Sequence, residues 1–246
     1  MITDIGIISQ TPEVVPAAKD ALHFDSVYSD KCTLPLNFVT GTRTISTWVK
    51  PDYTTYNGMT REFLYAQYNT SGQRTTFTEF RETGVLRTYI PTSTTGNNFA
   101  LIESNPGVYF NANQWYYVSV TIDSLDNTAK MYVDGVLQNS TAPSTVPFSR
   151  TGAYFVYGSA GTYLPTLRFN GTLKELTVWT ISRTQSEIVA DMTRVWTGAE
   201  TGLKAYFPTN EGSGNTIQDI NSVYTGTITT TNTTPNYIDD VMWVNS

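Results

Sequence analysis

The chain has 246 residues, of which only 15% are charged, and its net charge at pH 7 is −6. This length fits a single large β domain with its own core, and the one cysteine, Cys32, excludes an intrachain disulfide. The acidic balance, with no basic run, argues against a nucleic-acid partner, and no segment approaches the roughly 18 consecutive apolar residues of a membrane span.

The composition favours strands. Aromatic residues reach 13% and Thr is the commonest residue, whereas the Ala, Leu, Glu and Lys of a helical bundle are scarce. Residues 1–20 contain two prolines and no periodic apolar face, which predicts an extended arm before one domain at residues 21–246. This start has no basic region, so we expect no secretory signal peptide in the chain.

Short β-rich segments follow one another after the arm, each bounded by Gly, Asn, Pro or Ser clusters. The predicted strands of this first half are 22–25, 43–50, 62–68, 74–82, 85–91 and 99–103. The clearest hairpin joins residues 115–122 to 129–133. Apolar residues alternate along both of its arms, and a polar turn separates them.

The second half continues with strands predicted at 154–157, 173–179, 203–207 and 226–230. One helix is predicted between them. Thr184 and Glu187 form a capping box, and Ile188, Met192 and Val195 recur at helical spacing, so the helix should run about ten residues and end before Gly198. The strand at 203–207 presents one apolar face, which we expect to be buried in its own sandwich beside the opening strand at 22–25.

Four stretches together resemble the laminin-G-like, concanavalin A-type jelly rolls, a superfamily that includes pentraxins, legume lectins and bacterial and phage adhesive modules. They are Leu22–Asp25, Arg43–Pro51, the pair Gln114–Ile122 and Met131–Gly135, and Phe169–Trp179 followed by Ser182–Val189. The likeness covers about residues 21–230. It implies an all-β, two-sheet antiparallel jelly-roll sandwich with one short α-helix.

Two features depart from the family pattern. Lys174 stands where the family often places an Asp that helps to hold a structural Ca²⁺. Gly202–Gly214 resembles the segment that often opens such a domain, yet here it follows the helix.

Catalysis is not expected. The family's hydrolases carry Glu-x-Asp-x-x-Glu on one strand, and this string is absent. The nearest acidic pair, Glu79 and Glu82, has an odd separation, so we expect solvated charges on opposite faces. The single histidine, His23, is expected to be structural with Asp25 as its hydrogen-bond partner, and Cys32 to be a buried or idle thiol.

Oxygen-rich loops at 123–127, 219–222 and 239–240 are candidate Ca²⁺ ligands, but none has a recognised ligand spacing. Asp and Asn are also the residues that turns require. We therefore predict no cofactor, with any bound Ca²⁺ weak and peripheral.

Carbohydrate binding needs an aromatic ring that stacks on a sugar, together with amides and hydroxyls that orient it. Two neighbouring segments of the chain supply both kinds of group. The candidate residues are Tyr53, Tyr56, Asn57, Tyr65, Tyr68 and Asn69. The alternative is that these tyrosines only cover sheet faces.

The fold alone fixes no function. The leading hypothesis is a non-catalytic structural or decoration protein of a virion or another extracellular surface, which attaches to glycans and contacts other copies or other subunits of an assembly. The missing secretory signal favours a virion protein released by lysis. The alternative is a stand-alone carbohydrate-binding lectin module of a bacterial cell-surface system.

Overall fold

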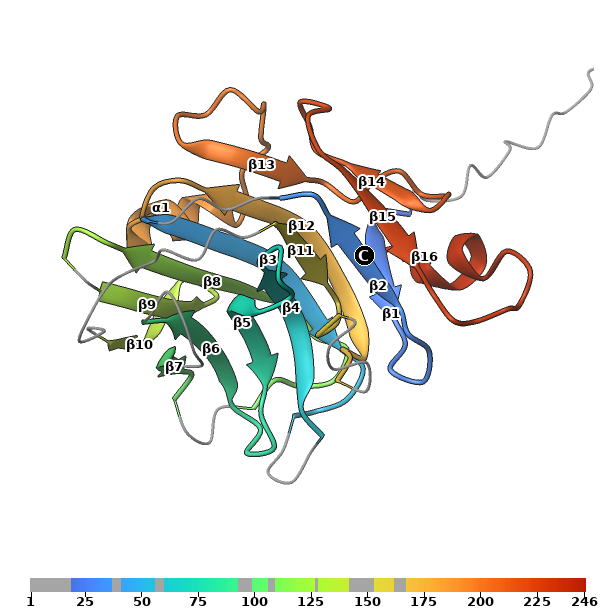
Figure 1. Ribbon diagram of the computed structural model, residues 1–246, viewed down its shortest axis with the longest axis horizontal. Coiled ribbons are helices and arrows are strands. Elements are labelled where there is room, and N and C mark those ends of the chain that lie inside the picture. Colours follow the sequence, from blue (N-terminus) through green and yellow to red (C-terminus); the bar gives the residue numbers. More distant parts are fainter. Residues whose placement is uncertain are drawn as a thin grey trace, which may run out of the picture.

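The computed structural model describes residues 19–36, 41–55, 60–92, 99–105, 109–126, 128–141, 153–161 and 167–246. These residues form two antiparallel sheets of eight strands each (Figure 1). The predicted all-β jelly-roll sandwich is confirmed. No helix among the described residues is long and apolar enough to cross a membrane.

Sheet A has the strand order β10-β9-β8-β3-β12-β1-β16, and β13 also pairs with β12. Its strands are β1 (Ala21–Phe24), β3 (Arg43–Pro51), β8 (Tyr116–Asp123), β9 (Thr128–Val133), β10 (Val136–Thr141), β12 (Gly171–Trp179), β13 (Leu203–Phe207) and β16 (Trp243–Val244).

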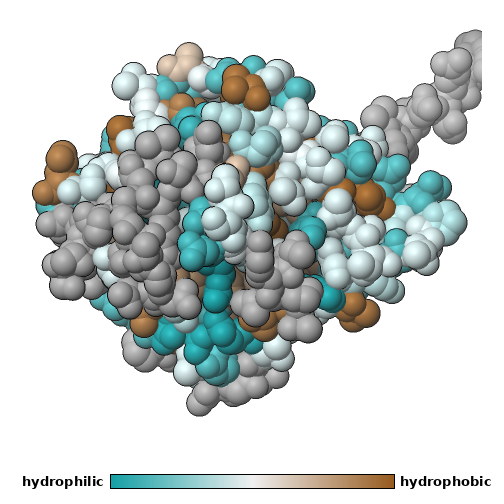
Figure 2. Space-filling view, in the orientation of Figure 1, coloured by the Kyte–Doolittle hydropathy of each residue, from teal (hydrophilic) through white to brown (hydrophobic). Residues whose placement is uncertain are grey.

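Sheet B has the order β14-β15-β2-β11-β4-β5-β6-β7. Its strands are β2 (Lys31–Leu34), β4 (Glu62–Tyr68), β5 (Arg74–Phe80), β6 (Leu86–Pro91), β7 (Phe99–Glu103), β11 (Tyr154–Tyr157), β14 (Thr216–Gln218) and β15 (Thr225–Thr229). The inner faces of both sheets contribute to one large core. On the face of the molecule in Figure 2, the described hydrophobic residues form small separate patches.

The predicted hairpin is β8 and β9, and its register pairs Val120 with Met131 and Ile122 with Ala129. All four side chains lie in the core. The apolar alternation therefore identified both the pairing and the buried face.

Helix α1 (Gln185–Asp191) begins with the predicted capping box at Thr184 and Glu187. It ends earlier than predicted, and Val195 is 88% exposed rather than part of an apolar helix face. A π-helical turn (Ile238–Met242) precedes β16.

The late strand β13 is buried in its own sandwich, as predicted, with Ala205 and Phe207 in the core. It pairs with β12 and not directly beside β1, which is a correction to the predicted neighbour. β1 occupies the edge of β12 only up to Leu173, and β13 takes the same edge from Leu176 onward. A bulge near Trp179 places Leu203 with Tyr206 on the outer face.

Strands β13–β16 gather at one end of the sandwich (Figure 1) and complete both sheets. β15 pairs with β2 and β16 pairs with β1. Residues 1–18 of the predicted arm lie outside the described residues. Asp20 already belongs to the domain, because its N–H donates to the Val244 carbonyl at 3.1 Å and its carboxylate accepts from the Ser246 N–H at 2.8 Å.

Candidate functional site

The sequence-predicted sugar residues do not form one surface. Tyr65 and Tyr68 are fully buried, and the Tyr68 hydroxyl donates to the Ala160 carbonyl. Neither ring offers a free face to a sugar, so both residues are corrected to core positions. Tyr53 is partly buried against the core, and its hydroxyl lies near the Glu62 carboxyl group.

Asn69 is half-buried, and its side chain shapes a turn. Its carbonyl oxygen accepts from the N–H groups of Ser71 at 3.0 Å and Gln73 at 2.8 Å. The two remaining candidates, Tyr56 and Asn57, lie outside the described residues.

The acidic pair Glu79 and Glu82 differs from the prediction. The Glu79 side chain is fully buried, and its carboxylate binds Arg61 at 2.6 Å and Arg81 at 3.1 Å. Arg81 also binds Glu82, so one guanidinium connects the two carboxylates. Both glutamates therefore belong to one network of arginine–carboxylate ion pairs on sheet B. They are not two separate solvated charges.

His23 and Cys32 have structural surroundings. The His23 ring lies 2.8 Å from the Asp52 carboxylate, which corrects the predicted partner Asp25. Cys32 is buried as predicted, and burial raises the pKa of its thiol far above the usual range. A buried neutral thiol is a poor nucleophile.

Two of the oxygen-rich loops act as turns, and the third, at 239–240, lies in the π-helical segment. The Asp123 carboxylate accepts from the Leu125 N–H at 2.9 Å, and Asp219 accepts from the N–H groups of Asn221 and Tyr224. Within the described ranges, no three His, Cys, Asp or Glu side chains are grouped so that they could hold a metal ion.

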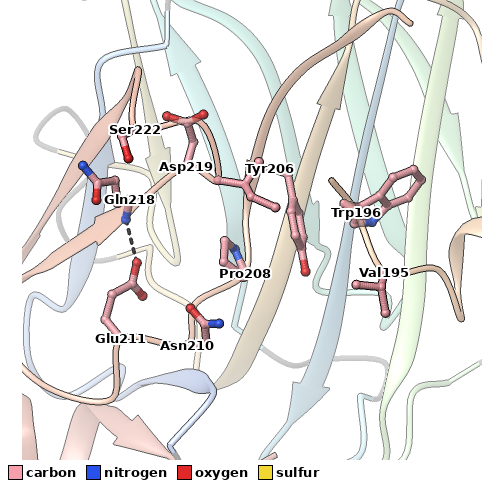
Figure 3. Close-up of a pocket in the computed structure, with 10 residues that line it drawn as sticks. Val195, Trp196, Tyr206, Pro208, Asn210, Glu211, Gln218, Asp219 and Ser222 are labelled. Atoms are coloured by element: carbon pink, nitrogen blue, oxygen red, sulfur yellow. Dashed lines mark hydrogen bonds between the residues drawn. The ribbon is translucent and has the colours of Figure 1, made fainter. Parts of the chain in front are cut away.

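A cleft of about 450 Å³ lies where β13 meets the turn between β14 and β15 (Figure 3). This volume is within the range of small-molecule sites. Three parts of the chain line the cleft: the segment after α1, the end of β13 with the following loop, and the end of β14 with its turn. The lining residues are Val195, Trp196, Tyr206, Pro208, Asn210, Glu211, Gln218, Asp219, Ile220 and Ser222.

Hydrogen bonds hold these parts together. The Ile220 N–H donates to the Tyr206 carbonyl at 2.9 Å, which connects the turn to β13. The Asn221 amide donates to the Gly198 carbonyl at 2.9 Å, which connects the same turn to the segment after α1. The cleft is therefore a preformed part of the fold.

Aromatic residues form one side of the cleft. Trp196 packs edge-on against Trp179, with the ring centroids 5.1 Å apart, and lies 6.3 Å from the ring of Tyr206. Figure 3 shows Tyr206 between Trp196 and the polar side chains of the cleft. Burial raises the pKa of Tyr206 above its usual range, so its hydroxyl stays protonated and can donate a hydrogen bond.

The polar side has unused hydrogen-bonding capacity. Glu211 accepts from the Gln218 N–H at 2.7 Å through one oxygen. Among the described residues, the side chains of Asn210, Gln218 and Ser222 make no hydrogen bond to the protein, so they can bind a ligand.

The sequence pattern did not predict this cleft. Of its residues, only those at 219–222 were candidates for a site, as Ca²⁺ ligands. The available signal was Tyr206 followed at even spacing by Pro208 and Asn210, because such residues can continue on one side of an extended chain.

The profile of the concanavalin A-like lectin/glucanases superfamily matches residues 25–189. The chain therefore belongs to this superfamily, in its laminin-G-type branch, and has a lectin-like fold. The matched range ends at residue 189, so all ten residues that line the cleft lie beyond it. No curated protein sequence matches the chain.

Three solved structures share the fold at low sequence identity. A candidate carbohydrate-binding protein from Bacteroides ovatus ATCC 8483 is 17% identical with a TM-score of 0.62, and the alignment covers 87% of this chain and 59% of that longer one. The heptameric SAP-like pentraxin of Limulus polyphemus is 15% identical over 74% of this chain and 82% of its own, with a TM-score of 0.55. The CBM40 module of the Ruminococcus gnavus IT-sialidase, bound to α2,3-sialyllactose, is 13% identical over 70% of this chain and 96% of its own, with a TM-score of 0.51.

Proposed function

We propose that the protein is a non-catalytic carbohydrate-binding protein and that the cleft beside β13 binds a neutral sugar residue. The observation that carries the proposal is the combination of an aromatic side with three free polar side chains in a cleft of ligand size. Trp196 and Tyr206 are 3% and 9% exposed, so they offer the sugar an apolar edge, while the free amides and hydroxyl can orient it. The carbohydrate-binding proteins of the same fold support a saccharide as the ligand.

The charges of the cleft favour a neutral ligand. Glu211 and Asp219 are both acidic, and an anionic sugar would be repelled by them. The Asp219 carboxylate already accepts hydrogen bonds from two backbone N–H groups. Hydrolysis of a glycosidic bond needs two available carboxyl groups, so the cleft is expected to bind without cleaving.

A glycan array followed by calorimetry with the best neutral ligand tests this proposal. Gln218→Ala and Asn210→Ala should each weaken binding by about 5-fold or more, because each removes ligand hydrogen bonds. Asn139→Ala on the exposed edge strand β10 is the matched amide control and should change nothing. Neutral-glycan binding that is unaffected by both cleft variants would overturn the cleft assignment, and hydrolysis lost in Glu211→Gln would overturn the non-catalytic assignment.

A second proposal concerns assembly, with a virion or another extracellular surface as the location. The exposed apolar side chains Leu101, Val136 and Leu137 lie on β7 and β10, the terminal strands of the two described sheets. Such edges can pair with another copy or another subunit.

Because residues 19–20 are already tied to the domain, deletion of residues 2–18 should leave the melting temperature unchanged. It should abolish incorporation into a particle or oligomer, and a truncated chain that still assembles would contradict an assembly role for the arm.

We also propose that folding needs no resident metal. Addition of a chelator should lower the melting temperature by less than about 5 °C, which corresponds to one or two kcal/mol in a domain of this size. A larger decrease would reveal a Ca²⁺ site.

A further inference from the structure

Sheet A carries a second group of residues with binding chemistry, on its outer face and away from the cleft residues in sequence. Lys50 at the end of β3, Trp115 just before β8 and Lys174 in β12 come from three adjacent strands. Each of them adjoins in sequence a core residue. These core residues are Val49, Tyr116 and Leu173. Because successive side chains of a strand point to opposite faces, the two lysines and Trp115 point outward.

Both lysine side chains converge on one indole. The Lys50 Nζ lies 4.8 Å from the centroid of the Trp115 ring, and the Lys174 Nζ lies 4.9 Å from it. The two ammonium groups are therefore within about one Debye length of each other, roughly 10 Å at 0.1 M ionic strength, so their charges act together. All three residues are half-buried and remain accessible to solvent.

Neither lysine is neutralised by an ion pair. Among the described residues, no carboxylate lies within 4 Å of the Nζ of Lys50 or Lys174. The neighbouring carboxylate of Asp52 is bound to His23. Glu175 follows Lys174, and burial raises the pKa of its carboxyl group, while the nearby charge of Lys174 offsets part of this shift.

Like charges gathered at one aromatic ring repel each other, and an anion between them removes the repulsion. The half-buried indole adds apolar surface beside the anion. We propose that Lys50, Trp115 and Lys174 form a binding site for an acidic saccharide, whose carboxylate or sulfate group binds both ammonium groups while the rest of the sugar contacts the accessible part of the indole.

This site is independent of the proposed neutral-sugar cleft. Lys174 is also the residue that departs from the family pattern, where an Asp often stands. The departure exchanges a cation-attracting group for an anion-attracting one at a half-buried, solvent-accessible position of the sheet.

Fluorescence titration of the full chain tests the site with three probes: a sulfated heparin disaccharide, glucuronic acid and neutral lactose. The two acidic probes distinguish sulfate from carboxylate, and lactose should give no response at Trp115. Lys50→Gln and Lys174→Gln should each weaken acidic-probe binding about 10-fold, as expected for a lost charged hydrogen bond. The corresponding Arg variants should retain it, and higher salt should weaken it.

Lys130→Gln is the matched control, because this lysine lies on β9 of the same sheet without a stacked indole. Trp115→Phe should remove the fluorescence response while melting as the parent protein does. Equal affinities of the parent and both lysine-to-glutamine variants would overturn the proposal. Acidic-probe binding that is lost in Gln218→Ala but kept in the lysine variants would also overturn it, by placing the acid in the cleft.

Discussion

Glu62 begins β4 at the end of the sandwich and is only 8% exposed. Burial raises the pKa of Glu62 from 4.5 to about 7, and the nearby charge of Asp52 adds to this effect. A hydrogen bond of 2.9 Å from the Asn170 N–H to its carboxylate offsets part of the shift. The folded protein therefore holds a proton on Glu62 at pH values where the unfolded chain has released it.

This difference fixes the direction of the pH dependence. Between about pH 4.5 and 7 the folded state binds more protons at this site, so the contribution of Glu62 to the free energy of unfolding falls as pH rises. One pKa unit corresponds to about 1.4 kcal/mol, which gives a loss of about 3 kcal/mol above pH 7. Glu62→Gln keeps an oxygen for the Asn170 N–H and removes the titration.

Urea denaturation at about pH 5 and about pH 8 measures the effect. Relative to the parent, Glu62→Gln should gain up to about 3 kcal/mol at the higher pH and much less at the lower. Glu82→Gln, a half-exposed carboxylate nearby, is the control and should follow the parent. Equal changes in the parent and in Glu62→Gln between the two pH values would rule out a raised pKa for Glu62.

Three further substitutions test the packing. Asp191→Asn removes the carboxylate 2.5 Å from the buried guanidinium of Arg183 and leaves only Glu187, at 3.3 Å, to balance its charge. Urea denaturation should show a loss of about 2 to 3 kcal/mol, with a loss below about 1 kcal/mol contradicting it. Thr184→Ala removes the helix cap and should cost about 1 kcal/mol in the same assay, whereas Thr184→Ser should cost little. Gly158→Ala should cost about 2 kcal/mol or more, because the φ of Gly158 is +80° and a Cβ would lie 2.3 Å from the Phe24 ring. An unchanged melting temperature in this last variant would show that Phe24 moves aside freely.

Local patterns predicted most of the fold. The alternation in β8 and β9 and the capping box of α1 depend on neighbouring residues, so both could be identified from sequence. Four strands were missed: β2, β10, β14 and β16. β14 and β16 have three and two residues, too few to show a period, and β10, with the sequence VLQNST, has no apolar alternation.

The candidate site was much harder to predict. Tyr65 and Tyr68 lie on β4, which is buried along its whole length, so their residue type says nothing about exposure. The odd spacing of Glu79 and Glu82 was outweighed by the reach of Arg81, which binds both. The cleft depends on the contact between Ile220 and Tyr206, a tertiary hydrogen bond that no local spacing encodes.

The shared edge of β12 has a consequence for how the protein folds. Along one edge, β12 pairs with β1 and with β13. β2 pairs with β15, which lies nearly 200 residues later in the chain. Such distant pairings are slow, because a long loop must close before the contacts stabilise it. The early strands should therefore keep exposed edges during synthesis until residues 203–244 emerge, and refolding should end with a slow phase in which these last strands attach to the preformed sandwich.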